Sequence, residues 1–224
     1  MSKLSLQLRP HMHWCNSGGR VVFLDSLADR YFGLPNSLNE AFLRLAAGEP
    51  TSADMDCLRI LVDCRVLSVI DGAAAIAPPP RIETPTHDLA GSDRAGAPLL
   101  ALLQALVWEV RASSSLRQRS LHLVLSSARR RRVRQTRPGI DPTQRLSRVA
   151  AAAEAIALLT RRHDRCLVRA LAVHATCRRS GAQAKLVFGV IAHPFTAHCW
   201  VQAGRGVVVG GYEHARLYTP ILVI

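Results

Sequence analysis

The first eighty residues change from a strand-like pattern to a helical one. Residues 20–25 and 29–34 are rich in β-branched and aromatic side chains, which suit a half-buried pleated surface. They predict a β-hairpin. Apolar residues then recur at intervals of three and four over residues 36–47 and 52–67, which predicts two amphipathic helices. A hairpin followed by helices is a winged-helix-like arrangement.

The last part of the chain shows helical spacing first and strand-like runs afterwards. Helices are expected at residues 99–125, 143–161 and 166–179, and strands at residues 185–191, 197–202 and 206–209. Helices followed by an antiparallel sheet indicate a segregated α+β domain.

Residues 78–98 separate these two parts. They hold several prolines and glycines and few large apolar side chains, which is the composition of a linker. We therefore expect two domains, at residues 1–80 and 99–224, joined by a linker at residues 81–98.

The composition is that of a globular protein, because 49% of the 224 residues are hydrophobic. No signal-peptide-like run opens the chain, and no later run of about 18 apolar residues predicts a membrane span. We therefore expect a cytoplasmic protein with no membrane partner, whose six cysteines are free thiols. The histidines and cysteines lack a paired ligand spacing, so we expect no metal site.

The positive charge is concentrated in one segment. The formal net charge is +13, yet residues 1–80 hold 7 basic and 8 acidic side chains, whereas residues 116–165 hold 13 basic and 3 acidic ones. A winged-helix-like DNA-binding protein that uses the basic residues 117–148 is therefore one hypothesis. A DNA-reading domain normally carries its own phosphate-binding charge, so we favour a solvated helix face or a protein-docking surface for Arg129–Arg132, and no nucleic-acid partner.

Cys166 and His198 are candidates for a nucleophile and its base. Cys166 opens a predicted helix, where unpaired N–H groups and the positive end of the helix dipole favour a thiolate. His198 lies on a later predicted strand, and a histidine beside such a thiol serves as base and then as acid. Taken alone, the two residues also fit a buried cysteine and a structural histidine. Cys177 and Cys199 are less suitable nucleophiles, because one lies mid-helix and the other faces away from His198.

Four segments carry a more specific signal, at residues 165–171 (RCLVRAL), 186–190 (LVFGV), 197–202 (AHCWVQ) and 218–222 (YTPIL). They resemble the transglutaminase-like cysteine protease half of the fused B proteins of lasso-peptide biosynthesis. The hairpin with residues 30–34 (RYFGL) is similar to the leader-recognition domain of the same systems, which is related to the small PQQ-biosynthesis chaperone fold. The resemblance implies an α+β chain in which a winged-helix-like recognition domain precedes a papain- or transglutaminase-like protease domain.

The resemblance assigns catalysis to Cys166 and His198, with one departure from the family. Its members complete a Cys-His-Asp triad, and the matching position here is Gly210. Glu213, the only carboxylate side chain downstream, is the candidate substitute. Gln202 or a backbone carbonyl is the alternative group for orienting the imidazole.

The resemblance also implies a substrate and partners. The first domain would capture the leader of a ribosomally made precursor as an added β-strand, and the second would cut at the leader-core junction. The candidate leader contacts are Tyr31, Leu58, Leu61, Val62 and Arg65. The implied partners are that leader and an asparagine-synthetase-like lactam synthetase.

The resemblance also bears on cofactor use and on the alternative function. Some family members are described as needing ATP, but no phosphate-binding glycine loop is present, so no cofactor is assigned. The missing aspartate keeps a non-catalytic leader-binding chaperone as the alternative function.

Overall fold

The first part of the chain forms a small antiparallel sheet. The computed structural model describes residues 4–90, 99–130, 141–160 and 165–224 and confirms the α+β class. The sheet contains β2 (Met12–Ser17), β3 (Arg20–Asp25) and β4 (Arg30–Gly33), with β3 in the middle. Gly18 and Gly19 join β2 to β3 with φ angles of 61° and 84°, as a tight two-residue hairpin turn requires.

Two helices and a second pair of strands complete this part. Helix α1 (Asn36–Ala47) precedes α2 (Ser52–Asp63), and β1 (Leu4–Leu8) pairs with β5 (Leu67–Asp71). Thr51 and Asp54 form a capping box at the start of α2, and the Asp54 carboxylate also accepts hydrogen bonds from Arg44 of α1. The helix predicted at 52–67 is too long, because α2 ends at Asp63 and Leu67 already belongs to β5.

A five-stranded sheet forms the second part. Its strand order is β10 (Thr219–Val223), β7 (Lys185–Ile191), β8 (Thr196–Ala203), β9 (Gly206–Val209) and β6 (His87–Asp88). Strand β6 comes from the expected linker and pairs in parallel with β9. The next residue, Leu89, is buried, so this segment contributes to the sheet and to its core.

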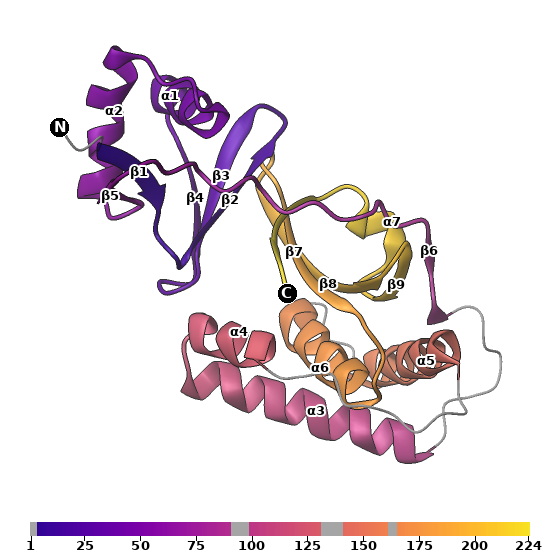
Figure 1. The fold of residues 1–224 in the computed structure, drawn as a ribbon. Coiled ribbons are helices and arrows are strands. Elements are labelled where there is room, and N and C mark those ends of the chain that lie inside the picture. The colour runs from indigo at the N-terminus through magenta and orange to yellow at the C-terminus, as the bar shows by residue number, and fades with distance from the viewer. Residues whose placement is uncertain (1–3, 91–98, 131–140, 161–164) are drawn as a thin grey trace.

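Helices cover the two faces of this sheet unequally (Figure 1). Helices α3 (Leu99–Gln118), α4 (Leu121–Arg130), α5 (Pro142–Thr160) and α6 (Cys166–Arg179) lie on one side. The short α7 (Tyr212–Ala215) lies on the other, against Trp200 and Val207. The continuous helix predicted at 99–125 is divided, because α3 ends before Ser120 and α4 starts after it.

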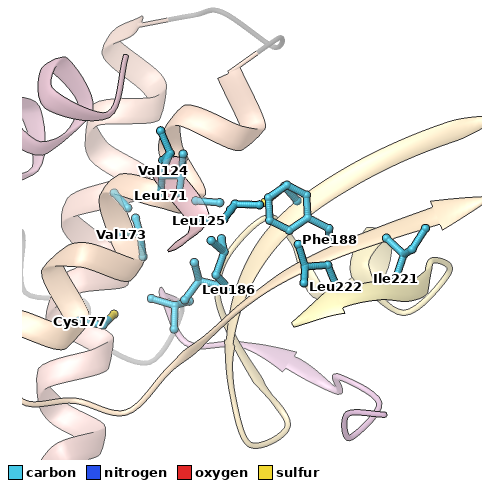
Figure 2. Packing of buried hydrophobic residues seen from close by; sticks show 14 of the residues in the cluster. Val124, Leu125, Leu171, Val173, Cys177, Leu186, Phe188, Ile221 and Leu222 are labelled. Atoms are coloured by element: carbon cyan, nitrogen blue, oxygen red, sulfur yellow. The ribbon is translucent and has the colours of Figure 1, made fainter. Parts of the chain in front are cut away.

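The core between the helical layer and the sheet is the largest in the protein. Phe188 and Leu222 of the sheet pack with Leu171 of α6 and with Val124 and Leu125 of α4, as Figure 2 shows. Buried aliphatic side chains of this kind supply most of the stabilisation of a domain.

Strand β3 belongs to two cores at once. Val21 and Phe23 pack with α1 and α2, whereas Val22 and Leu24 join the large core of the second part. Successive side chains of a strand point to opposite faces of the sheet. Because both faces of β3 are buried, its residues 21–24 are all apolar and do not alternate with polar ones. The two parts of the protein therefore share a hydrophobic core as well as the connecting segment.

Helix α3 has an exposed apolar stripe that includes Leu99, Leu103 and Val110. Within the described ranges it is the one helix with the length and apolar content of a membrane span, and little of it is buried in this structure. In this structure α3 packs along α5 and α6.

The packing around Gly189 of β7 makes a testable prediction. A Cβ atom added to Gly189 would lie 2.7 Å from the Trp200 ring and 2.8 Å from Cβ of Tyr218. Overpacking of this kind costs about 1–3 kcal/mol, so Gly189→Ala should lower the free energy of unfolding, measured by denaturant titration, by that amount. The control is Gly33→Ala, whose added Cβ would meet its nearest neighbour at 3.6 Å. Equal stability of the two variants would contradict the described packing.

Candidate active site

Cys166 is the first residue of α6. The preceding Arg165 makes no side-chain hydrogen bond to the first turn of the helix, so this residue leaves the first-turn N–H groups uncapped. The Cys166 side chain is partly buried at the margin of the large core. Partial exposure at the positive end of a helix is the environment that a nucleophilic cysteine requires.

The other five cysteines differ from Cys166 in burial or location. Burial raises the pKa of Cys15 and of Cys177 to about 12, and that of Cys199 well above its usual value. Thiols with such pKa values stay protonated at neutral pH. Cys57 and Cys64 are exposed and lie in and next to α2. Cys166 is therefore the candidate nucleophile of the second part.

The imidazole of His198 is held by a backbone carbonyl. Its Nε2 lies 2.9 Å from the Gly210 carbonyl oxygen, which accepts a hydrogen bond and cannot donate one. Nε2 therefore carries the proton, and Nδ1 of the neutral ring is left as the basic nitrogen. Burial, followed by the charge of His214, lowers the pKa of His198, while the bond to Gly210 acts in the opposite direction.

Aromatic rings fix the His198 side chain further. The ring stacks on Trp200 at a centroid distance of 5.9 Å and contacts Tyr218 at 5.3 Å. Gly210 has a φ of 115°, and an added Cβ would lie 2.5 Å from the Trp200 Cβ and 3.2 Å from His198 Nε2. An aspartate does not fit at position 210 in this conformation, so the group of residue 210 that contacts His198 is its backbone carbonyl.

Cys166 begins α6, which packs against β8, the strand that carries His198. Burial, followed by the charge of Cys166, raises the pKa of Cys199, which belongs to the core that α6 covers. Because successive strand residues point to opposite faces, His198 points toward Trp200 and Tyr218 on the other side of β8. In the described chain no hydrogen bond joins the Cys166 thiol to the His198 ring.

The side chains expected to orient His198 are engaged elsewhere. Glu213 is exposed and accepts a hydrogen bond of 3.3 Å from the Tyr212 hydroxyl. The Gln202 amide donates to the carbonyls of Glu83 and Gly204 and accepts from Trp200 Nε1. Of the three groups considered from the sequence, the structure brings the backbone carbonyl to the ring and neither side chain.

The candidate leader contacts separate into different environments. Leu58 and Leu61 are core residues of the first part, at 0% and 2% exposure, so they are not available to an incoming peptide. Val62 is half-buried and Arg65 is exposed beyond the end of α2. Tyr31 lies on β4 and packs against the large core that extends to α6.

Tyr31 packs against the same core as the candidate nucleophile, which its sequence position does not reveal. Burial raises its pKa, and the charges of Cys199, Asp29 and Cys166 add to this effect. Its ring lies 5.6 Å from Phe195, in the turn between β7 and β8. A residue of the first part and Cys166 therefore border one core, although they are distant in sequence.

Comparison with known families decides the class of this fold. The sequence model of the transglutaminase-like superfamily matches residues 106–223, which contain Cys166, His198 and strands β7 to β10. The chain belongs to the transglutaminase-like superfamily. The superfamily includes cysteine peptidases and acyltransferases, so the transglutaminase-like fold supports thiol-based acyl transfer. No curated protein and no solved structure matched the chain.

Two other expectations concern metal and charge. Over the described ranges, no group of three histidine, cysteine or carboxylate side chains is arranged to hold a metal ion. Arg129 and Arg130 are exposed at the end of α4. Arg131 and Arg132 lie outside the described residues, as does the rest of the basic segment up to residue 140.

The surroundings of His198 predict how its pKa responds to substitution. Glu213→Gln should leave that pKa unchanged, because Glu213 does not touch the ring. His214→Gln should raise it, because the charge of His214 lowers it in the native protein. Titration of the ring nitrogens by ¹⁵N NMR measures both. A lower pKa in Glu213→Gln would contradict the described site, since removing a nearby carboxylate lowers the pKa of a histidine.

Proposed function

We propose that this protein is a cysteine peptidase that binds the leader of a ribosomally made precursor and cuts it at the leader-core junction, as in lasso-peptide maturation. The observation that carries the proposal is the position of Cys166 at the start of α6 in a transglutaminase-like fold, beside the strand that holds a neutral His198. The sequence segments around these two residues resemble those of lasso-peptide B proteins.

The chemistry follows from the two side chains. Sγ of Cys166 attacks the scissile carbonyl carbon, and Nδ1 of His198 takes the thiol proton. The imidazolium returns that proton to the leaving amine, the C–N bond breaks, and a thioester remains on Cys166. Water then attacks the thioester with His198 as base, which releases the leader carboxylate and the free thiol.

In this structure Cys166 borders the core on the α6 side of β8, whereas His198 faces Trp200 and Tyr218 on the other side. The steps therefore require β8 and the start of α6 to rearrange when a substrate is bound, in addition to a rotation of the ring. Catalytic hydrogen bonds are often long or misaligned without substrate and tighten in the complex. The Gly210 carbonyl can hold Nε2–H, but unlike a carboxylate it carries no net charge to stabilise the imidazolium. We therefore expect a Cys-His dyad that works more slowly than the family triad.

A groove beside β4 supports the location of the leader. Strand β4 is an edge of its sheet in the described chain. The adjacent groove of about 480 Å³ is lined by Tyr31 and Phe32 of β4 and by His193 and Phe195 of the β7–β8 turn. An extended leader would add to this edge through main-chain hydrogen bonds. The β7–β8 turn that borders the groove leads into β8 and so to His198.

The other parts of the proposal concern the implied partners. The product of cleavage is a core peptide with a free amino terminus, which an asparagine-synthetase-like lactam synthetase would consume. Val62 and Arg65 remain proposed leader contacts outside the groove. We assign no cofactor, and an ATP requirement rests on the resemblance alone.

A non-catalytic leader-binding chaperone is the second candidate function. Two observations favour it: no carboxylate contacts His198, and no hydrogen bond joins the ring to Cys166 in the described chain. Leader binding with no cleavage of the precursor is the result expected of such a protein.

The nucleophile is tested by single cysteine substitutions. Cys166→Ala should reduce leader release from a lasso-peptide precursor that the native protein cleaves by at least about 10³-fold, because the thioester cannot form. Mass spectrometry of the incubated precursor measures the release. The exposed Cys57→Ala and Cys64→Ala are the matched controls and should retain the native rate. Cleavage by Cys166→Ala at the native rate would rule out the peptidase mechanism.

The leader groove is tested in the full-length protein. Phe195 is 52% exposed and lines the groove, so Phe195→Ser should leave folding intact and raise the leader Kd about tenfold by removing an aromatic contact. Leu217→Ser, a similarly exposed change away from the groove, is the control. Fluorescence anisotropy with a labelled leader peptide measures both. An unchanged Kd in Phe195→Ser would place the leader elsewhere.

A further inference from the structure

The turn that holds the candidate base contains two consecutive glycines. Gly210 and Gly211 join β9 to α7, and their φ angles of 115° and 74° are ones that other residues rarely adopt. The Gly210 carbonyl accepts the hydrogen bond from Nε2 of His198. Because glycine leaves the backbone unusually free, the position of this carbonyl depends on how the two ends of the turn are fixed.

The sheet fixes one end of this turn, and a side chain from a distant segment fixes the other. Before the turn, Val209 of β9 pairs with Val201 of β8. After the turn, the backbone N–H of Tyr212 donates a hydrogen bond of 2.9 Å to Oδ1 of Asp88. Tyr212 is the first residue of α7, where a backbone N–H has no acceptor within the helix. The Asp88 carboxylate supplies that acceptor from 124 residues earlier in the chain.

The backbone around Asp88 is itself held by the sheet. Asp88 lies on β6, which pairs in parallel with β9. On one side of it, the N–H of Thr86 donates to the Arg205 carbonyl at 2.9 Å, and on the other side the N–H of Leu89 donates to the Val207 carbonyl at 2.8 Å. The Leu89 side chain is buried in the large core. The exposed carboxylate of Asp88 is therefore attached to a well-anchored main chain.

We propose that Asp88 is a positioning residue of the candidate active site, which keeps the Gly210 carbonyl on Nε2 of His198. It acts through the N–H of Tyr212, so its effect reaches the imidazole by way of the turn backbone. The segment that connects the two parts of the protein thus contributes to the site. The effect of Asp88 on catalysis rests on the peptidase function proposed above, whereas its effect on the His198 ring does not.

Titration of the His198 ring nitrogens by ¹⁵N NMR, in the full-length protein, tests this inference. The native neutral ring should carry its proton on Nε2. Asp88→Ala should move part of the neutral ring to the tautomer protonated on Nδ1. It should also lower the pKa of His198, because the hydrogen bond to Gly210 raises that pKa. Asp88→Asn keeps an oxygen acceptor for the Tyr212 N–H and should restore the native tautomer and pKa.

A second variant removes the same hydrogen bond from the donor side. Tyr212→Pro lacks the N–H and places proline at the first position of a helix, where it is tolerated. It should reproduce the tautomer change of Asp88→Ala, and it decides the outcome if Asp88→Ala does not fold.

Glu83→Ala is the matched control, because it removes an exposed carboxylate from the same connecting segment and keeps the backbone carbonyl that accepts from Gln202. It should leave the tautomer and the pKa of His198 unchanged. With a precursor that the native protein cleaves, Asp88→Ala should lower kcat about tenfold and leave KM unchanged, because the change acts on the imidazole and not on leader binding.

Three results would overturn the inference: a native tautomer and pKa in Asp88→Ala, an equal change in Glu83→Ala, or a change in Asp88→Asn as large as that in Asp88→Ala. The last result would mean that the charge of Asp88, and not its hydrogen bond, acts on the ring. A native protein that cleaves no precursor would contradict the proposed function alone, since the titration requires no activity.

Discussion

The burial of strand β3 on both faces is the constraint on which the arrangement of this protein depends. Val21 and Phe23 complete the core of the first part, while Val22 and Leu24 complete the core of the second. Separating the two parts would expose the second pair to water, and each fully buried aliphatic side chain of this size contributes about 1.5–3 kcal/mol. The same packing brings the neighbouring strand β4, and with it Tyr31, to the core that Cys166 also borders.

The hydrogen bond from His198 Nε2 to the Gly210 carbonyl determines what the imidazole can do. A carboxylate in a catalytic triad has two effects: it fixes the tautomer of the imidazole, and its negative charge stabilises the imidazolium. The Gly210 carbonyl provides the first effect and leaves Nδ1 as the basic nitrogen, but it has no negative charge to provide the second. The lowered pKa of His198 agrees with this, because burial and a neighbouring histidine both disfavour the charged ring.

The groove at β4 is joined to the strand of the candidate base by a single turn. The β7–β8 turn borders the groove and leads into β8, which carries His198. If the groove holds a leader as proposed, the tethered substrate has a raised effective concentration at the second part of the protein without strong contacts around the scissile bond.

The sequence by itself determined the α+β class, most of the helices and strands of both parts, and Cys166 and His198 as candidates, because helical and strand periods and local motifs depend on neighbouring residues alone. Short strands such as β1, β6 and β10 were missed, since each is defined by a partner far away in the chain. Only the tertiary structure decided that Gly210, and not Glu213, orients His198, and that Leu58 and Leu61 are core residues. The physical reason is that every residue has a backbone carbonyl, so the sequence does not mark the one that binds a side chain. Likewise, an apolar residue type on a helix is the same whether the position faces a core or a ligand.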